Sequence, residues 1–301
     1  MRLPRLLPWA VRAAWATLPF TVGAALAAAL DERSSAVRTT ASAGLWAAWV
    51  VVLVATLVPH PISLTALRVS MPAVVVATAL AAAAGEATAW SIGAAVVVVG
   101  LSFLPETAMH FVNGPAYPDE RRFPLRPPGP VLVVGLAPAW TAAVGAVPAG
   151  VLLWAAGRAV LGAVVVAVGV PVAGVLLRAL HGLSRRWVVF VPAGLVLHDG
   201  LALTDPVLFP KKVVEELRLA PVGTDSLDLT KAAFGLALEL LLKEKVPMVL
   251  AVPGSRTGEP GASARLLFAP TRPGAVLREA AARGLAVGQA AMPPPSTSSP
   301  S

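Results

Sequence analysis

A polar segment, VNGPAYPDERRFPLRPPGP at residues 112–130, interrupts a chain that is otherwise rich in Ala, Val and Leu. Its charged residues stand close together: Asp119, Glu120, Arg121, Arg122 and Arg126. Carboxylates with a nearby histidine, here His110, are the groups that general acid–base catalysis uses. Arginines among aromatic rings are instead typical of contacts at the membrane interface. Three roles are therefore open to the segment: an active-site loop, a binding surface or a stiff connector.

Other constellations that carry chemistry do not occur in the sequence. There is no cysteine, which excludes disulfides and thiolate ligands. The four histidines are scattered, and no two of them have a metal-ligand spacing. The Gly-rich stretch at residues 253–264 lacks the Gly-Lys-Ser/Thr of a phosphate loop, and we interpret it as a long flexible hairpin loop. We therefore expect no catalytic residue, no metal and no cofactor, and a protein that is not an enzyme.

The composition indicates a membrane protein. Hydrophobic residues make up 56% of the chain and charged residues 13%, whereas soluble domains carry about a quarter charged residues. The long apolar runs precede Ser184, and most lysines and acidic residues follow it. The formal charge of +8 belongs mainly to residues that flank apolar runs, which favours anionic headgroups over nucleic acid as the partner. The bias towards Ala, Val, Pro and Arg is typical of high-GC bacteria.

Six apolar stretches approach the length of about 20 residues that a membrane-crossing helix needs. They are residues 13–30, 43–58, 69–84, 89–104, 131–156 and 159–180. Pro138, Pro148 and Pro171 fall inside the last two, which predicts kinks there. Glycines four residues before alanines, such as Gly145 and Gly169, predict close helix contacts.

The arginines predict the orientation, because cytoplasmic loops carry an excess of Lys and Arg. One side of the membrane receives Arg2, Arg5, Arg12, Arg68, Arg121, Arg122, Arg126, Arg178, Arg185 and Arg186. The other side receives Arg33, Arg38 and Arg158. The sequence therefore predicts a multi-pass protein of the plasma membrane with both termini in the cytoplasm. An alternative treats residues 1–30 as a cleaved signal peptide, which leaves five spans and the same cytoplasmic C-terminus.

After Ser184 the hydrophobic period changes to two, which is typical of strands. About seven strands are predicted from this pattern and from turn residues between them. They are residues 187–191, 195–203, 207–209, 213–219, 236–243, 246–252 and 265–268. A helix beginning at Pro273 follows, with Val276, Leu277, Ala280, Ala281 and Leu285 on its apolar face.

This order resembles the bacterial pleckstrin-homology-like (PH-like) domains. The resemblance is carried by RRWVVFVPAGLVLHDGLAL, LFPKKVVEELRLAP, FGLALELLL and LLFAPTRPGAVLREAAARGL. It covers about a third of the chain and implies a small closed sheet capped by a helix, which often serves interaction or assembly. It brings no catalytic residues.

The predicted fold is a polytopic α-helical membrane bundle of about six spans, followed by a small β-rich cytoplasmic domain. The expected boundaries are 1–183 for the membrane part, with a cytoplasmic loop at 105–130, then 184–288 for the PH-like domain and 289–301 for a disordered tail. We expect the protein to anchor or organise a partner protein at the inner face of the membrane. The alternative is a transporter or lipid-handling protein with a path along spans five and six.

The polar segment at 112–130 then becomes a bracket rather than an active site. Its prolines stiffen it, and Phe111, Tyr117 and Phe123 are expected at the interface. We expect it to pack against the membrane-facing side of the β-rich domain. The candidate interface and headgroup residues are Tyr117, Asp119, Glu120, Arg121, Arg122, Arg126, Arg185 and Arg186.

Overall fold

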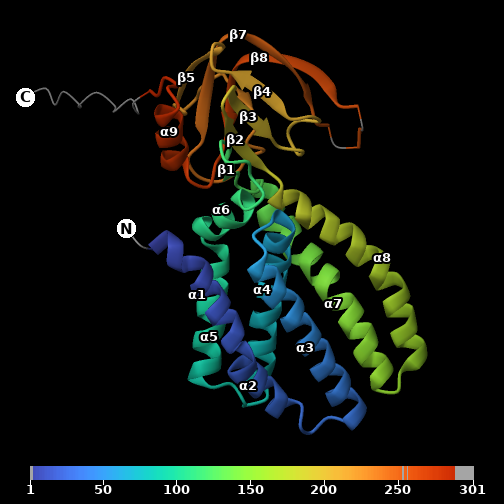
Figure 1. Cartoon of the computed structure of the whole chain (residues 1–301). Coiled ribbons are helices and arrows are strands. Elements are labelled where there is room, and N and C mark those ends of the chain that lie inside the picture. The colour runs from blue at the N-terminus through green and yellow to red at the C-terminus, as the bar shows by residue number, and fades with distance from the viewer. Residues whose placement is uncertain (1–2, 253, 256, 289–301) are drawn as a thin grey trace, which may run out of the picture. The chain divides into compact units, whose positions relative to one another are not determined.

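The computed structural model describes residues 3–252, 254–255 and 257–288, so the tail expected at 289–301 lies outside the described residues. The chain forms two compact units, and each is built from two stretches of sequence. The helical unit comprises Met1–Pro118 and Pro130–Arg185, and the β-rich unit comprises Asp119–Gly129 and the residues from Arg186 onward. Figure 1 shows the helices of the first unit and the sheets of the second.

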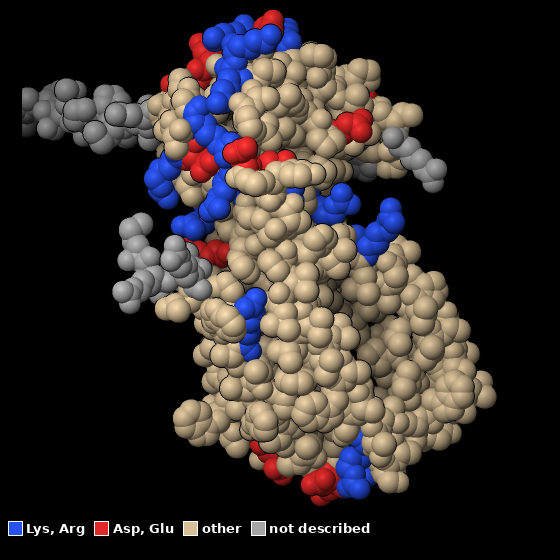
Figure 2. Space-filling model, viewed as in Figure 1, with Lys and Arg blue, Asp and Glu red and all other residues tan. Residues whose placement is uncertain are grey.

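The helical unit contains long α-helices joined by short turns. In chain order they are α1 (Leu3–Thr17), the 3-10 turn η1 (Leu18–Phe20), α2 (Val22–Ala29), α3 (Ser35–Leu57), α4 (Pro61–Ala83), α5 (Ala89–Phe103), α6 (Pro105–Asn113), the π-helical turn η2 (Val131–Gly135), α7 (Leu136–Ala155) and α8 (Ala159–Ser184). Among the described residues, five helical stretches are long and apolar enough to cross a membrane, and the bent pair of α5 and α6 would add a sixth. Figure 2 shows the flank of this unit as almost free of charged side chains. By length and composition, these helices agree with the expected multi-span membrane part.

The pair α5–α6 bends by 56° because Pro105 has no backbone N–H. In a continuous helix residue 105 would donate to the carbonyl of Leu101. The hydroxyl of Thr107 donates to that carbonyl instead, at 2.6 Å. A side chain therefore satisfies the carbonyl that the helix break leaves without its backbone donor.

The third span begins earlier than predicted. His60 is the N-cap of α4, since its Nδ1 accepts the backbone N–H of Ile62 at 3.2 Å, and Pro61 occupies the first helical position. Arg68 therefore lies two turns inside α4, and the expectation that it belongs to a loop before Val69 is wrong.

Small residues allow α7 and α8 to approach closely. A Cβ added to Gly162 would lie 2.7 Å from the carbonyl oxygen of Gly150, and one added to Gly150 would lie 2.8 Å from Val166 Cγ2. Gly169 also faces α7, as expected, but Gly145 has no neighbour within 4 Å of such a Cβ. The prediction of close packing is thus right for these helices, with partly different glycines.

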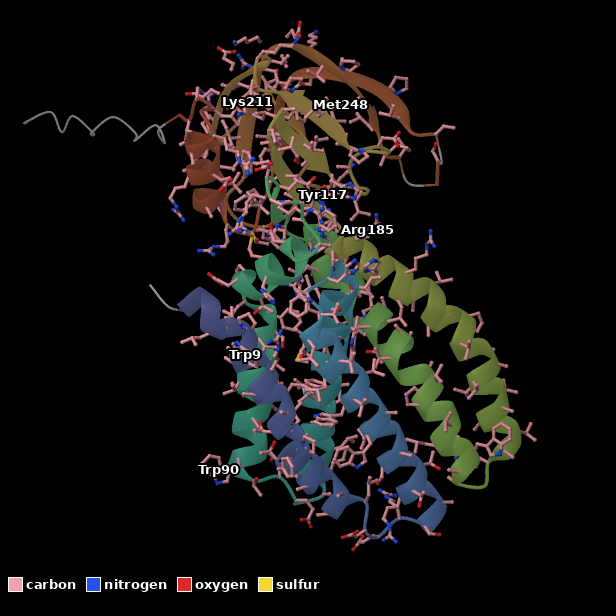
Figure 3. The ribbon with its side chains drawn as sticks, in the orientation of Figure 1. Trp9, Trp90, Tyr117, Arg185, Lys211 and Met248 are labelled. Atoms are coloured by element: carbon pink, nitrogen blue, oxygen red, sulfur yellow. The ribbon has the colours of Figure 1, made fainter. Side chains whose placement is uncertain are left out.

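Exposed tryptophans stand near helix ends in this unit. Trp90 is the second residue of α5 and is 83% exposed, and Figure 3 shows it projecting from the end of the helical unit. Trp154 is exposed near the end of α7. Tryptophans in such positions are typical of the boundary between hydrocarbon and headgroups.

The β-rich unit contains two four-stranded sheets. Its strands are β1 (Arg121–Pro124), β2 (Trp187–Val191), β3 (Gly194–His198), β4 (Val207–Pro210), β5 (Val214–Leu219), β6 (Leu227–Asp228), β7 (Leu238–Leu250) and β8 (Glu259–Phe268). One sheet has the order β1-β2-β3-β4 and is antiparallel throughout. The other has the order β5-β7-β8-β6, in which β6 is parallel to β8. Alternate residues of the strands supply a core that includes Phe190, Phe209, Phe268, Leu197 and Leu217.

Two predicted strands are one in the structure. Residues expected at 236–243 and 246–252 form the single strand β7, whose pairing with β8 shifts register between Leu241 and Val246. The predicted loop at 253–264 is correspondingly too long, because β8 begins at Glu259. A bulge permits one strand to continue through a change of register.

The predicted C-terminal helix is present as α9 (Pro273–Ala282). Val276 and Ala280 are fully buried, whereas Ala281 is exposed, so the apolar face is narrower than expected. The chain after the helix returns to the second sheet, where the N–H of Leu217 donates to the carbonyl of Ala286 at 2.9 Å. The helix therefore covers the β5 side of this sheet.

The segment expected as a bracket is a strand of the domain itself. β1 pairs with β2 in the register Arg121↔Phe190 to Pro124↔Trp187. Thr271 N–H also donates to the carbonyl of Pro124 at 2.9 Å. Residues 119–129 therefore belong to the β-rich unit rather than to a loop of the helical part at 105–130, and α6 occupies the beginning of that loop.

Candidate functional site

The acidic and basic pairs of the polar segment bind groups of their own domain. Arg122 Nη2 lies 3.0 Å from Glu120 Oε2, and its guanidinium carbon lies 5.6 Å from the centre of the Trp187 ring. Arg283 of the turn after α9 donates to the carbonyl of Asp119 at 2.9 Å. His110, the third group of the acid–base hypothesis, belongs to the helical unit. The contacts fit a structural or binding role better than proton transfer.

Arg186 forms a buried ion pair, and the expectation that it contacts lipid headgroups is wrong. Its Nε and Nη2 donate to the two carboxylate oxygens of Asp199 at 2.6 and 2.7 Å. The side chains of Arg186 and Asp199 are only 2% and 1% exposed. Arg186 Nη1 also donates to the carbonyl of Arg126 at 2.6 Å. This bidentate pair therefore holds the chain that follows β1 against the β2–β3 hairpin.

Arg126 binds the loop that precedes β7. Its Nη1 donates to the carbonyls of Phe234 and Leu236 at 3.2 and 2.9 Å. Its own N–H donates to the carbonyl of Ala269 at 2.8 Å. The guanidinium is therefore engaged by protein carbonyls, and it orders an exposed loop.

The remaining interface candidates, Tyr117, Arg121 and Arg185, are exposed. Tyr117 and Arg185 are labelled in Figure 3, and both belong to the helical unit. Phe111 and Phe123, which we expected beside Tyr117 at the interface, are instead buried at 2% and 3% exposure. Their aromatic rings serve the cores of the two units.

Glu239 is a fully buried carboxylate that no sequence motif indicated. It lies opposite Arg218 in the pairing of β5 with β7 and accepts a hydrogen bond from Arg218 Nε at 2.8 Å. Thr224 and Ser226 donate their hydroxyls to its other oxygen at 2.6 and 2.5 Å. Burial raises the pKa of Glu239, but the hydrogen bonds from Ser226, Thr224 and Arg218 lower it by more, so the pKa lies below its usual value. This cluster stabilises the turn between β5 and β6.

A reciprocal pair of indoles joins α1 to α3 in the helical unit. Trp15 Nε1 donates to the carbonyl of Trp49, and Trp49 Nε1 donates to the carbonyl of Trp15, each at 3.0 Å. The carbonyl of Trp15 needs this donor because residue 19, its partner in a continuous helix, is a proline. The indole of Trp49 therefore supplies the hydrogen bond that the carbonyl of Trp15 lacks at the break between α1 and α2.

A cavity of about 360 Å³ lies beside this indole pair. Its lining comes mainly from α1, α2, α3 and α4, with Val144 of α7. Small side chains such as Gly23, Ala48 and Ala73 leave the space open, and Ser42 and Ser70 are its hydroxyl groups. The Ser70 hydroxyl already donates to the carbonyl of Ala66 at 2.8 Å. A mostly apolar lining of this size suits a hydrocarbon chain.

Charged side chains in the helical unit are few and individually placed. Arg12 Nε donates to the carbonyl of Thr56, near the end of α3, at 3.1 Å. Arg68 places its guanidinium carbon 5.7 Å from the centre of the Phe103 ring, and its buried Nε has no hydrogen-bond partner among the described residues. His181 of α8 shares a hydrogen bond of 2.8 Å with Thr65 of α4. No carboxylate accompanies Arg68 among these contacts.

Within the described ranges no group of three His, Asp or Glu side chains is arranged to hold a metal ion. Two ion pairs of the β-rich unit contain buried charged side chains: Arg186 with Asp199, and Arg218 with the buried Glu239. The apolar cavity and the exposed surface of the β-rich unit are open to other molecules.

Comparison with known proteins adds no relative: no protein-family model, no curated protein and no solved structure matches the chain.

Proposed function

We propose that this chain is an integral membrane protein whose β-rich unit is a PH-like interaction module that anchors or organises a partner protein at the inner face of the plasma membrane. The observation that carries the proposal is the way the module is attached. Its first strand comes from the chain between α6 and η2, and its other strands follow α8. The module is therefore joined to the membrane helices at three points of the chain.

These connections are short. Only Arg185 and Arg186 separate α8 from β2, and six residues separate β1 from η2. A domain held in this way differs from one on a long flexible linker, because short connections to α6, η2 and α8 limit how far it can move. Such an attachment is suited to holding or positioning a partner and to sensing its presence.

The module also offers a surface for a partner. β4 is an edge strand, and Leu208 on it is 42% exposed. Leu201, in the turn before β4, is exposed to a similar extent. An exposed edge with apolar side chains is a frequent docking site for an extended peptide. The two four-stranded sheets and the covering helix α9 are the features that support a PH-like fold.

The proposed orientation places both termini in the cytoplasm. Arg33 lies in the turn between α2 and α3 together with Asp31 and Glu32, and Arg38 lies in the first turn of α3. Arg158 lies in the turn between α7 and α8. The opposite ends of the spans are followed by the more basic segments. The excess of arginine on the side of the β-rich unit supports a cytoplasmic module.

A photo-crosslinking amino acid at Leu208 tests the proposed function in living cells. We expect one protein to be captured from this position and not from Lys243, an exposed residue in the middle of β7. The captured protein should lose its membrane association when the gene is deleted. The wild-type chain should restore it, and Leu208→Glu should not, because the charge opposes apolar docking. A captured protein whose location ignores the deletion would contradict the proposal.

A lipid-handling role is the second candidate, and the cavity beside Trp15 and Trp49 favours it. The lining differs from the path expected along spans five and six, since α8 contributes no lining residue and α7 contributes Val144. Pro148 and Pro171 lie inside α7 and α8, which continue through them. The candidate path therefore belongs to the first three spans.

Filling the cavity tests this second role. We expect Ala73→Phe to reduce the amount of lipid that co-purifies with the protein, because the ring would occupy the space. Val76→Phe, on the exposed face of the same helix, is the matched control and should leave it unchanged. Mass spectrometry of the purified protein measures both. Equal lipid in the two variants would exclude the cavity as a lipid site.

A further inference from the structure

The segment 231–237, in the loop between β6 and β7, presents two apolar side chains to its surroundings. We call it the apolar loop. Phe234 is 59% exposed and Leu236 is 61% exposed. The backbone is turned sharply here, with φ angles of 54° at Lys231, 56° at Ala232 and 93° at Gly235. Residues other than glycine adopt such angles only where the surroundings hold them.

Residues 126–129 hold the loop backbone at these angles. Gly129 N–H donates to the carbonyl of Ala232 at 3.1 Å, and Arg126 donates to the carbonyls of Phe234 and Leu236. A Cβ on Gly129 would overlap the carbonyl oxygen of Ala232 and would lie 3.2 Å from the Phe234 ring. The loop is therefore ordered with its apolar side chains outward, although exposure of such side chains to water is unfavourable.

Chain continuity limits the distance between the apolar loop and the start of a candidate membrane span. Gly129 is two residues before Val131, where the candidate span Val131–Ala155 begins. Two residues reach at most about 7 Å, so the carbonyl of Ala232 lies within about 10 Å of the start of that span. Peptide bonds impose this limit, whatever the arrangement of the two units.

The side chains around the loop suit the boundary between headgroups and hydrocarbon. Phe and Leu partition into the upper acyl region, and cations beside them attract anionic headgroups. Two cations accompany the loop: Lys231 is its first residue, and Arg126 donates to the carbonyl of Leu236. The nearby carboxylate of Asp228 accepts the N–H of Thr230. Exposure of Phe234 and Leu236 to water is unfavourable, whereas contact with a bilayer surface at this distance favours their outward orientation.

We propose that the apolar loop inserts Phe234 and Leu236 into the interfacial layer of the bilayer that holds the spans. The loop is then a second attachment of the β-rich unit to the membrane, in addition to the chain connections. This inference rests on the helical unit crossing a membrane and is independent of any partner protein. It differs from the expectation that Arg122 and Arg186 contact headgroups, because those side chains bind Glu120 and Asp199.

The absence of cysteine from the chain permits a direct test. Phe234→Cys and Leu236→Cys in the full chain are labelled with an environment-sensitive fluorophore and reconstituted in vesicles of mixed neutral and anionic phospholipids. We expect blue-shifted emission and quenching by lipids that carry a nitroxide near the headgroup. Lys212→Cys is the matched control. It lies before β5, whereas the apolar loop lies near the end of that strand, where Ala220 N–H donates to the carbonyl of Ala237 at 3.1 Å.

The outcomes separate the possible environments of the loop. Lipid quenching several-fold stronger at positions 234 and 236 than at 212, with weaker quenching by aqueous iodide, supports insertion. Emission and iodide quenching equal to those at position 212 would show an aqueous loop and overturn the proposal. A blue shift without lipid quenching would show that a protein surface covers the loop, and this too would overturn it. Leu236→Cys keeps the test valid if the substitution at Phe234 prevents folding.

Discussion

Asp199→Ala is expected to lower the free energy of unfolding of the β-rich unit by about 3–5 kcal/mol, because it leaves the buried guanidinium of Arg186 without its carboxylate. Both carboxylate oxygens of Asp199 accept hydrogen bonds from Arg186, and neither side chain has appreciable access to water. Arg186 also holds the carbonyl of Arg126. The loss should therefore extend to β1 and to the loop that Arg126 binds.

Hydrogen exchange of the full chain in membranes measures this effect. We expect faster exchange for peptides that cover β1, β2 and β3, with unchanged exchange for α7 and α8. The double variant Arg186→Met with Asp199→Leu removes both charges and should recover most of the stability. Asp205→Ala, in an exposed turn, is the control for loss of a surface carboxylate. Exchange rates for Asp199→Ala equal to those of Asp205→Ala would show that the ion pair is not a source of stability.

Acid is expected to destabilise the second sheet through Glu239. The folded-state pKa of this carboxyl lies below its usual value because three hydrogen bonds to the carboxylate outweigh its burial. The resulting stability is complete above the unfolded pKa, about 4.3, and is lost as the pH falls through the lower folded pKa. Unfolding by urea, followed through the exchange of peptides from β5 and β7, should therefore require less denaturant as the pH is lowered below about 4.

Glu239→Gln separates this group from the other carboxylates. The variant should be less stable by about 1.5–3 kcal/mol at neutral pH, because its amide cannot satisfy three donors that point to a carboxylate. Its stability should also change less with pH than that of the wild type. Glu244→Gln, an exposed residue of the same strand, should behave like the wild type. A wild-type pH profile in Glu239→Gln would assign the acid sensitivity to other groups.

The sequence predicted the helical unit well because apolar length alone decides whether a helix can cross a membrane. The errors there came from the helix ends. Apolar content begins near Val69, but Pro61 and the His60 cap start α4 eight residues earlier. Packing details were also out of reach, since an alanine-rich chain offers many small-residue pairs and Gly145 differs in no sequence feature from Gly169.

The β-rich unit was predicted from its period-two pattern, except for the strand that lies far away in the sequence. β1 has four residues, ends at Pro124 and is surrounded by prolines. Such a sequence predicts a connecting segment rather than a strand. A proline is tolerated at the end of a strand at the sheet edge, and the carbonyl of Pro124 still accepts the N–H of Thr271. Pairing over this sequence distance depends on tertiary contacts that no local pattern encodes.

The buried ion pair, in contrast, had a signal that the sequence analysis did not use. The register of the β2–β3 hairpin pairs Trp187 with His198, and extending it by one residue places Arg186 opposite Asp199. The same holds for Arg218 and Glu239 in the pairing of β5 with β7. Opposite charges at facing positions of a predicted hairpin are therefore better evidence for a pair than their distance from a membrane span.

The origin of β1 has a consequence for the order of events during synthesis. The ribosome releases residues 121–124 before it has made α7 and α8, and the strand that pairs with them follows both helices. The first strand must therefore remain unpaired on its own side of the membrane while two more helices are inserted. Folding of the β-rich unit can therefore be completed only after both helices have been synthesised. The pairing of β1 with β2 thus makes completion of this sheet depend on a chain that already contains α7 and α8.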